Sequence, residues 1–171
     1  MFTRAGIWVF FYNHLLEAIW PRVRQVLPHA TLDLIGGGPP ALLARYSSIP
    51  GVKALGRVAD LRPHVGAACC SVVPIRVGGG TRIKIVESWS MGRAVVSTSL
   101  GCEGLDGTDD VHLLIRDDPN RFAEAIIQLL QDEPLRHRLS VEAKRLVEAR
   151  YSWNSIGRYL TQRYTSLIEA N

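Results

Sequence analysis

The sequence predicts an α/β fold with a Rossmann-like parallel sheet, flanking helices and a helical C-terminal end. Short β-branched runs alternate with helical segments between residues 31 and 115, which is typical of a parallel sheet with right-handed crossovers. Beyond residue 117 only helical periodicity occurs. With 171 residues, 47% of them hydrophobic and 21% charged, the chain has the size and composition of one well-cored domain spanning residues 1–171.

The predicted strands are short runs of β-branched and aliphatic residues bounded by turn residues. Their ranges are 31–35, 52–55, 69–73 and 94–98, with 111–115 as a candidate fifth. Between them, helices are expected at 40–46, 60–68 and 81–91. Gly92 stands where a helix commonly ends in a left-handed backbone conformation.

Three helices are expected after the last strand. Asp118 is a good N-cap residue and is followed by proline, so a helix with one apolar face should begin there. Glu133, also followed by proline, opens a second helix to about residue 149. Ser152 caps a third, which runs to about residue 168.

The beginning of the chain departs from this pattern. A doubly wound sheet begins on a strand, but residues 6–18 read as an apolar helix and residues 1–5 show no strand pattern. We therefore expect the first strand to be missing and the chain to be a fragment, or a mis-started reading frame, of a longer protein. A sheet without that strand has an unpaired edge, which favours an edge-strand homodimer.

Composition excludes several classes of protein. The longest apolar run, 7–12, is far shorter than the roughly 20 residues of a membrane-spanning helix, and no small-residue cleavage site of a secretory signal follows it. The three cysteines form neither a disulfide framework nor a CxxC pair, which indicates a reducing, cytoplasmic compartment. The five histidines lack metal-ligand spacing, and a net charge of +4 without a basic run does not indicate nucleic-acid binding.

A glycine-rich turn at residues 78–80 is the most informative motif. It joins a predicted strand to a predicted helix, so its backbone can approach a ligand and direct free N–H groups at an anion. Arg82 and Lys84 then lie in the first helical turn, where the helix dipole disfavours each positive charge by about 0.3–1 kcal/mol. A diphosphate held by the amides of residues 79–81 and by these two cations would offset that effect.

Glu87 follows Lys84 by three residues and lies on nearly the same face of the helix. Its carboxylate could accept hydrogen bonds from both hydroxyls of a ribose; the alternative is a solvated Lys84–Glu87 ion pair. The segment is not a Walker A loop, because the Gly-x4-Gly-Lys-Ser/Thr spacing does not occur.

A second glycine cluster, residues 36–38, also follows a predicted strand. With Ala41 it loosely fits G-x-G-x-x-A, which leaves open an NAD(P)-binding reductase domain, a tight turn, or a turn whose Gly37 backbone faces a ligand. A dinucleotide site would have an acidic residue at the end of the next predicted strand, and this sequence has none there. Arg57 and Val58 stand at that strand's end, where they could line a base pocket or form a simple exposed loop.

Residues 74–98 and 101–105 resemble the C-terminal half of the group 1 (family 4) retaining glycosyltransferases of the GT-B fold. The resemblance extends over nearly the whole chain, and smaller matches follow in the expected order at 20–21, 34–36, 56–58, 112–114 and 151–153. In that family two Rossmann-like domains face each other, the N-terminal one binding the acceptor and the C-terminal one the sugar nucleotide. This chain is similar to the second domain only.

The resemblance implies transfer of a hexose from a UDP- or GDP-sugar to a saccharide or lipid-linked acceptor, with retention at the anomeric carbon and no metal or other cofactor. The family's usual setting is bacterial polysaccharide biosynthesis, in the cytoplasm and at the inner face of the membrane. The isolated chain, without an acceptor domain, should be inactive. The implied nucleotide-sugar-binding residues are Gly37, Arg57, Val58, Gly79, Gly80, Thr81, Arg82, Ile83, Lys84 and Glu87.

One departure from the family motif concerns the sugar. The family has two glutamates separated by seven residues; Glu87 matches the second, which contacts the ribose, whereas Gly79 replaces the first, which contacts the donor sugar. Sugar recognition therefore does not carry over, and no residue is assigned as catalytic. The alternatives are a sugar-nucleotide epimerase domain, the reductase domain, and a non-catalytic nucleotide-binding module.

Overall fold

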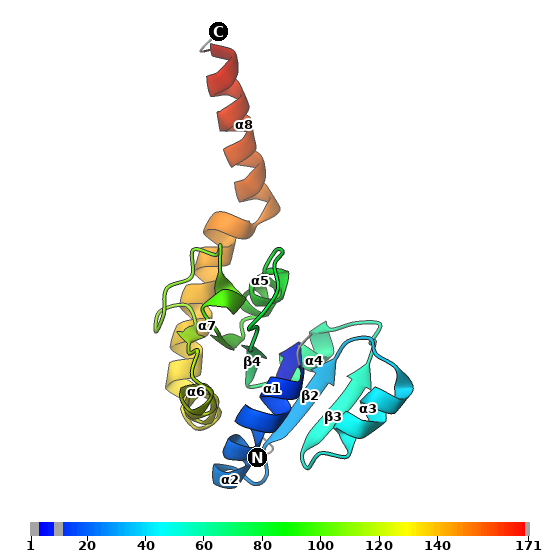
Figure 1. The fold of residues 1–171 in the computed structure, drawn as a ribbon. Coiled ribbons are helices and arrows are strands. Elements are labelled where there is room, and N and C mark those ends of the chain that lie inside the picture. The colour runs from blue at the N-terminus through cyan, green and yellow to red at the C-terminus, as the bar shows by residue number, and fades with distance from the viewer. Residues whose placement is uncertain (1–3, 9–11, 170–171) are drawn as a thin grey trace.

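The computed structural model describes residues 4–8 and 12–169, which form one six-stranded parallel sheet with helices on both faces (Figure 1). The strand order is β3-β2-β1-β4-β5-β6, the order of doubly wound nucleotide-binding folds. The predicted fold class is confirmed. The strands are β1 (Arg4–Trp8), β2 (Thr31–Ile35), β3 (Val52–Gly56), β4 (Cys70–Val73), β5 (Ala94–Ser97) and β6 (Leu114–Ile115).

The expectation of a missing first strand is wrong. β1 lies at the centre of the sheet, with Gly6 in register with Asp33 of β2 and with Ser71 of β4. A central parallel strand is covered on both faces and lacks the polar alternation of a half-exposed strand, so its apolar residues can be read as part of a helix. β1 is paired with β2 on one side and with β4 on the other. The homodimer was expected to form at the edge left by a missing first strand, so this reason for expecting it no longer holds.

The helical part of the N-terminal segment begins after that strand. It consists of α1 (Tyr12–His14), the π-helical turn η1 (Leu15–Ile19) and α2 (Trp20–Val26), so the expected helix at 6–18 started too early. The crossover helices are α3 (Pro40–Ser47), α4 (Arg62–Ala67) and α5 (Ile83–Ser90). A short 3-10 turn, η2 (Leu100–Cys102), follows β5.

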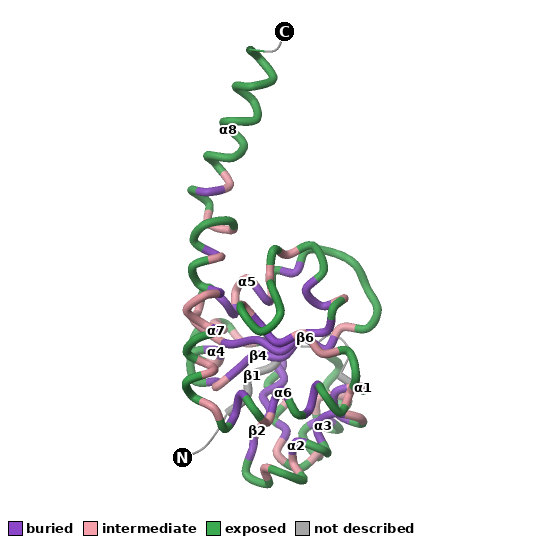
Figure 2. The backbone as a smooth tube through the Cα atoms, turned by 90° about the vertical axis from the view of Figure 1, so that its left-hand side faces the viewer, coloured by how far each residue is buried: buried purple, intermediate pink, exposed green. Residues whose placement is uncertain are grey.

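Two hydrophobic clusters hold the layers together, one on each face of the sheet. Val72 and Val96 pack with α2 and α6, whereas their neighbours Val73 and Val95 pack with α5 and α7. This division follows from the strand repeat, which points successive side chains to opposite faces. β2, β4 and β5 are accordingly buried almost throughout (Figure 2), whereas the edge strand β3 has two exposed residues.

The C-terminal helices are α6 (Pro119–Gln131), α7 (Glu133–Leu146), the π-helical turn η3 (Val147–Tyr151) and α8 (Trp153–Glu169). The predicted Asp118 cap is confirmed, since its carboxylate accepts hydrogen bonds from the amides of Asn120 and Arg121, both at 3.0 Å. Ser152 likewise accepts from the Ser155 amide at 3.1 Å. α8 then projects away from the body of the domain (Figure 1).

The three cysteines differ in exposure, and this gives a direct test of the packing. Burial raises the pKa of the Cys70 thiol to about 12 and also raises that of Cys102, whereas Cys69 is half-exposed. Only a thiolate reacts with a disulfide reagent. We expect one thiol, Cys69, to react rapidly with Ellman's reagent in the native protein and all three after denaturation. Cys69→Ser should remove the fast phase, and fast labelling of Cys70 would contradict this packing.

Candidate functional site

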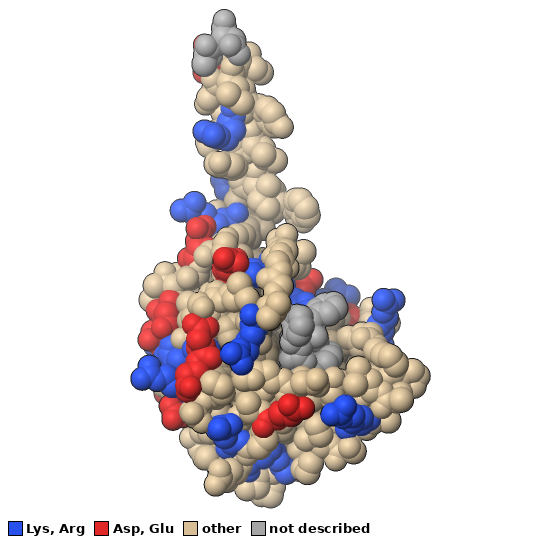
Figure 3. Space-filling view, viewed as in Figure 1, with Lys and Arg blue, Asp and Glu red and all other residues tan. Residues whose placement is uncertain are grey.

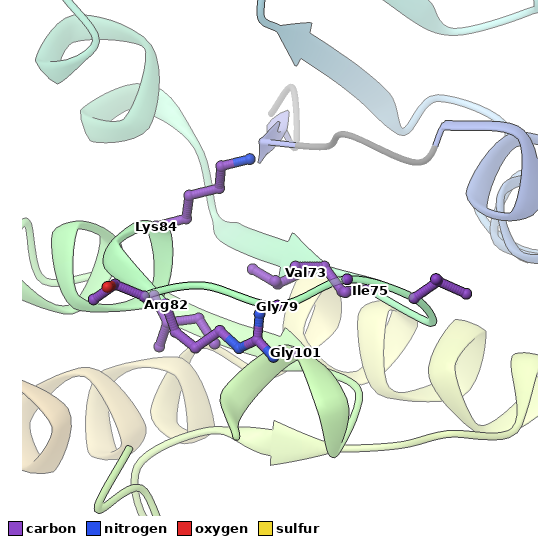
Figure 4. A pocket seen from close by; sticks show the side chains of 10 residues that line it. Val73, Ile75, Gly79, Arg82, Lys84 and Gly101 are labelled. Atoms are coloured by element: carbon purple, nitrogen blue, oxygen red, sulfur yellow. The ribbon is translucent and has the colours of Figure 1, made fainter. Parts of the chain in front are cut away.

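The candidate site lies beyond the C-terminal end of β4, next to β1, where the strand order reverses. Crevices at such switch points are the usual ligand sites of open α/β sheets. Here the loop between β4 and α5, together with η2, encloses a cavity of about 290 Å³ (Figure 4). Its walls are Val73, Ile75, Val77, Gly78, Gly79, Thr81, Arg82, Lys84, Ile85 and Gly101.

Glycines permit both the open loop and its close packing. Gly78 and Gly80 have φ angles of 125° and 102°, in a region that side chains rarely adopt. A Cβ added to Gly79 or Gly80 would meet no atom of residues 4–8 or 12–169 within 4 Å. The loop backbone is therefore accessible. Gly101 is the opposite case, because a Cβ there would lie 2.4 Å from Ser97 Oγ and 2.7 Å from the Val73 carbonyl.

Arg82 is a buried cation with unsatisfied hydrogen-bonding capacity. It is the N-cap of α5, so the helix begins two residues later than the predicted range, and its side chain is only 6% exposed. Nη2 donates to Glu103 Oε2 at 3.2 Å, but Nε is buried and has no partner among the described residues. Because an unpaired buried donor is unfavourable, this guanidinium is suited to a second anionic partner.

Lys84, near the beginning of α5, is half-buried. Burial lowers the pKa of its ammonium group, and the carboxylate of Glu87 partly opposes this shift. Its side chain leaves the helix in a different direction from Arg82, which reaches toward Gly79 and Gly101 (Figure 4). Glu87 lies one turn along α5 and is not among the residues that line the cavity.

A further cation, Arg76, lies in the loop beyond β4 and close to α1. Together with burial, its charge lowers the pKa of His14, while Glu17 raises it. This places Arg76 at the same end of the sheet as the cavity. Among the described residues, His, Cys, Asp and Glu side chains form no group of three or more that could hold a metal ion.

The predicted residues on the other half of the sheet form a separate cluster. A Cβ added to Gly37 would lie 3.1 Å from Nε of Arg57, so the ends of β2 and β3 bring these two residues together, with Val58 next in the chain. They do not line the cavity beside β4. Since β1 lies between β2 and β4, and adjacent strands are ~4.8 Å apart, the two clusters are roughly 10–15 Å apart across the sheet.

Two residues without a role in the sequence-based site lie beside Arg82. Glu103 follows η2, and Tyr151 ends η3; both line a second cavity of about 550 Å³, which also contacts Gly80 and Ile83. Glu103 could have been found from the sequence, because an acidic residue with glycines close on both sides, just after a strand, is a candidate site residue. Tyr151 lies far from the glycine-rich turn in sequence, and only the packing of η3 against α5 brings it near.

Comparison with known proteins agrees with this geometry. A model of the group 1 glycosyl transferases matches residues 11–132. The C-terminal domain of the group 1 glycosyl transferase LpcC from Francisella tularensis superposes with a TM-score of 0.72 at 18% identity, covering 88% of this chain and 87% of that one. No curated protein matches the chain.

Longer solved structures contain the same fold. Sucrose-phosphate synthase from Thermosynechococcus elongatus has a TM-score of 0.77 and 22% identity, covering 99% of this chain and 46% of that one. HepE from Anabaena, solved with UDP and glucose, has a TM-score of 0.77 and 18% identity, covering 95% of this chain and 48% of its own. The chain thus spans about half the length of these proteins.

The fold is therefore that of a GT-B glycosyltransferase C-terminal domain. The chain belongs to the group 1 glycosyltransferases, because the family model covers most of its length. Among its described residues, no helix is both long and apolar enough to span a membrane.

Proposed function

We propose that this chain binds the nucleoside diphosphate part of a UDP- or GDP-sugar and is the donor domain of a retaining hexosyltransferase. One observation carries the proposal: the buried Arg82 guanidinium, whose Nε has no hydrogen-bond partner in the part of the chain that the structure describes, lies against an open glycine-rich backbone. A diphosphate would supply the missing acceptor. HepE, whose structure contains UDP, offers support at the level of the fold.

The cations would act on the leaving group. When the bond between the anomeric carbon and the phosphate oxygen breaks, negative charge grows on the diphosphate, and fixed donors stabilise that charge most where water is excluded. Arg82 would donate through Nε, the backbone of residues 79–81 would add N–H groups, and Lys84 would add a second charge. No cofactor beyond the donor enters this proposal.

The remaining predicted residues would hold the nucleoside. Gly37, Arg57 and Val58 would contact the base, and Glu87 the ribose hydroxyls. The separation of the two clusters supports this arrangement, because an extended nucleotide can reach from the ends of β2 and β3 to the glycine-rich loop. Ile83, which faces the second cavity, would contact the far end of the donor.

The acceptor, a saccharide or a lipid-linked saccharide, would bind a domain that lies outside this chain. We place the reaction in the cytoplasm, beside the inner face of the membrane, as part of bacterial polysaccharide synthesis. On the face shown in Figure 3, acidic and basic side chains intermingle over the body of the domain, which favours a small anionic ligand over nucleic acid.

Calorimetric titration of the chain with UDP, GDP, NAD and inorganic pyrophosphate tests the proposal. We expect binding of UDP or GDP, weaker binding of pyrophosphate, and no sugar transfer by the chain alone. Binding of NAD without UDP or GDP would favour a reductase domain and would contradict the proposal. Absence of binding by all four ligands would contradict it as well.

A further inference from the structure

Two separate segments of the chain form the walls of the first cavity. Val73 and Ile75 belong to the end of β4 and the loop that follows it, whereas Gly101 belongs to η2, which follows β5. The side chain of Arg82 reaches toward Gly101 (Figure 4). The placement of the Arg82 guanidinium therefore depends on how these two segments are held relative to each other.

Thr98, the residue that follows β5, joins the two segments through its side chain. Its hydroxyl group donates a hydrogen bond to the Ile75 carbonyl and accepts one from the Gly101 amide at 3.0 Å. A hydroxyl has one donor hydrogen and free lone pairs, so both bonds form at the same time. Because Thr98 is only 5% exposed, water competes little for either bond.

The backbone around Thr98 is fixed as well. Its amide donates to the Val73 carbonyl at 3.3 Å, and its carbonyl accepts from the Cys102 amide at 3.2 Å. The amide and the hydroxyl of Ser99 both donate to the Asp117 carboxylate at 2.8 Å. Thr98 thus lies behind both walls of the cavity, although it is not among the residues that line it.

The position of η2 in turn affects Arg82. Glu103 follows η2 directly, and its amide donates to the Leu100 carbonyl at 3.4 Å. Its carboxylate accepts the hydrogen bond from Nη2 of Arg82 at 3.2 Å. A shift of η2 would therefore move the group that orients the guanidinium.

We propose that Thr98 is a positioning residue: its hydroxyl group fixes the spacing between the glycine-rich loop and η2, and thereby places Arg82 for a diphosphate. The inference rests on the proposed function, because it takes the diphosphate as the ligand. Thr98 acts only through the geometry of the cavity. Donors that are already held in place bind an anion more tightly than donors that must first reorganise.

The test uses two substitutions in the 171-residue chain and calorimetric titration with UDP, GDP and inorganic pyrophosphate. Thr98→Val keeps the shape of the side chain and removes the hydroxyl, so Kd should rise about tenfold. Thr98→Ser keeps the hydroxyl, and Kd should stay within about threefold of the natural value. Unchanged Kd values in Thr98→Val would overturn the proposal.

Ser155→Ala is the matched control for general destabilisation. It also removes a buried hydroxyl that donates to a backbone carbonyl, that of Glu148 at 2.8 Å, but Ser155 does not line the first cavity. Its melting temperature should fall, whereas its Kd values should stay within about twofold of the natural ones. A tenfold rise in Kd here as well would attribute the Thr98→Val effect to lost stability and overturn the proposal.

A double-mutant cycle shows whether Thr98 acts through Arg82. In a chain that carries Arg82→Ala, Thr98→Val should change Kd for UDP by less than about twofold, because the group that Thr98 positions is no longer present. A further tenfold loss in that background would mean that the two residues act independently, and would contradict the proposed role.

Hydrogen exchange of the free chain, followed by NMR, tests the geometry without a ligand. The Gly101 amide should exchange at least about tenfold faster in Thr98→Val, whereas the Cys102 amide, which donates to the Thr98 carbonyl, should be unchanged. Unchanged exchange at Gly101 overturns the role of Thr98 alone. Failure of UDP, GDP and pyrophosphate to bind the natural chain overturns the proposed function. If Thr98→Val does not fold by circular dichroism, the comparison of Thr98→Ala with Thr98→Ser decides.

Discussion

Replacing Arg82 with alanine is expected to weaken the binding of both UDP and inorganic pyrophosphate roughly 30- to 150-fold. The side chain is almost fully buried, so its charge acts with little screening by water, and its Nε has no competing partner among the described residues. A hydrogen bond to a charged group of this kind contributes about 2–3 kcal/mol. Calorimetric Kd values for the two ligands measure the effect.

Arg62→Ala is the control for this experiment. It removes the same charge from the chain, but Arg62 lies on the exposed surface at the start of α4, where it pairs with Asp60 at 2.9 Å. Its Kd for UDP should stay within about twofold of the natural value, because exposed ion pairs contribute little. Equal Kd values for Arg82→Ala and the natural chain would place the anion site elsewhere.

Replacing Ile7 with proline is expected to destabilise the whole domain. Ile7 pairs with Leu34 of β2 and with Val72 of β4, so its backbone belongs to the centre of the ladder. Proline removes a ladder N–H and is confined to edges in natural sheets. We expect a loss of about 3 kcal/mol or more in the free energy of unfolding, and a melting temperature lower by roughly 6–12 °C.

Ile7→Val isolates the backbone effect, because it keeps the amide and a β-branched side chain. Its melting temperature, followed by circular dichroism, should fall by only about 2–4 °C. If Ile7→Pro melted at the temperature of the natural chain, β1 could not be the strand that joins the two halves of the sheet.

Local patterns predicted most of the elements. The strand at residues 31–35 was predicted with the correct bounds, and the helix at 81–91 differed only at its ends. In both, alternating composition and flanking glycine or proline agree with the tertiary structure. Local sequence patterns did not predict β1. Its strand conformation depends on pairing with β2 and β4 on either side, and these contacts are not visible in a local pattern.

The site was predictable to the same extent. The strand-glycine-helix pattern located the loop and its cations, and four of the predicted residues, Gly79, Thr81, Arg82 and Lys84, line one cavity. The sequence did not show that Arg82 is buried against Glu103, because burial and pairing depend on how η2 packs beside α5. The nucleotide contacts assigned to these residues stay predictions.

The lining of the first cavity comes from one continuous stretch, from Val73 to Gly101. Closing such a short stretch loses little chain entropy, whereas pairing Gly6 with Ser71 requires a much longer loop to close. During folding, the pocket beside β4 can therefore form as a local unit before β1 enters the sheet. The cluster of Gly37 and Arg57 at the ends of β2 and β3 is aligned with that pocket only once β1 joins the two halves of the sheet, so we expect the two clusters to become ordered in separate kinetic steps.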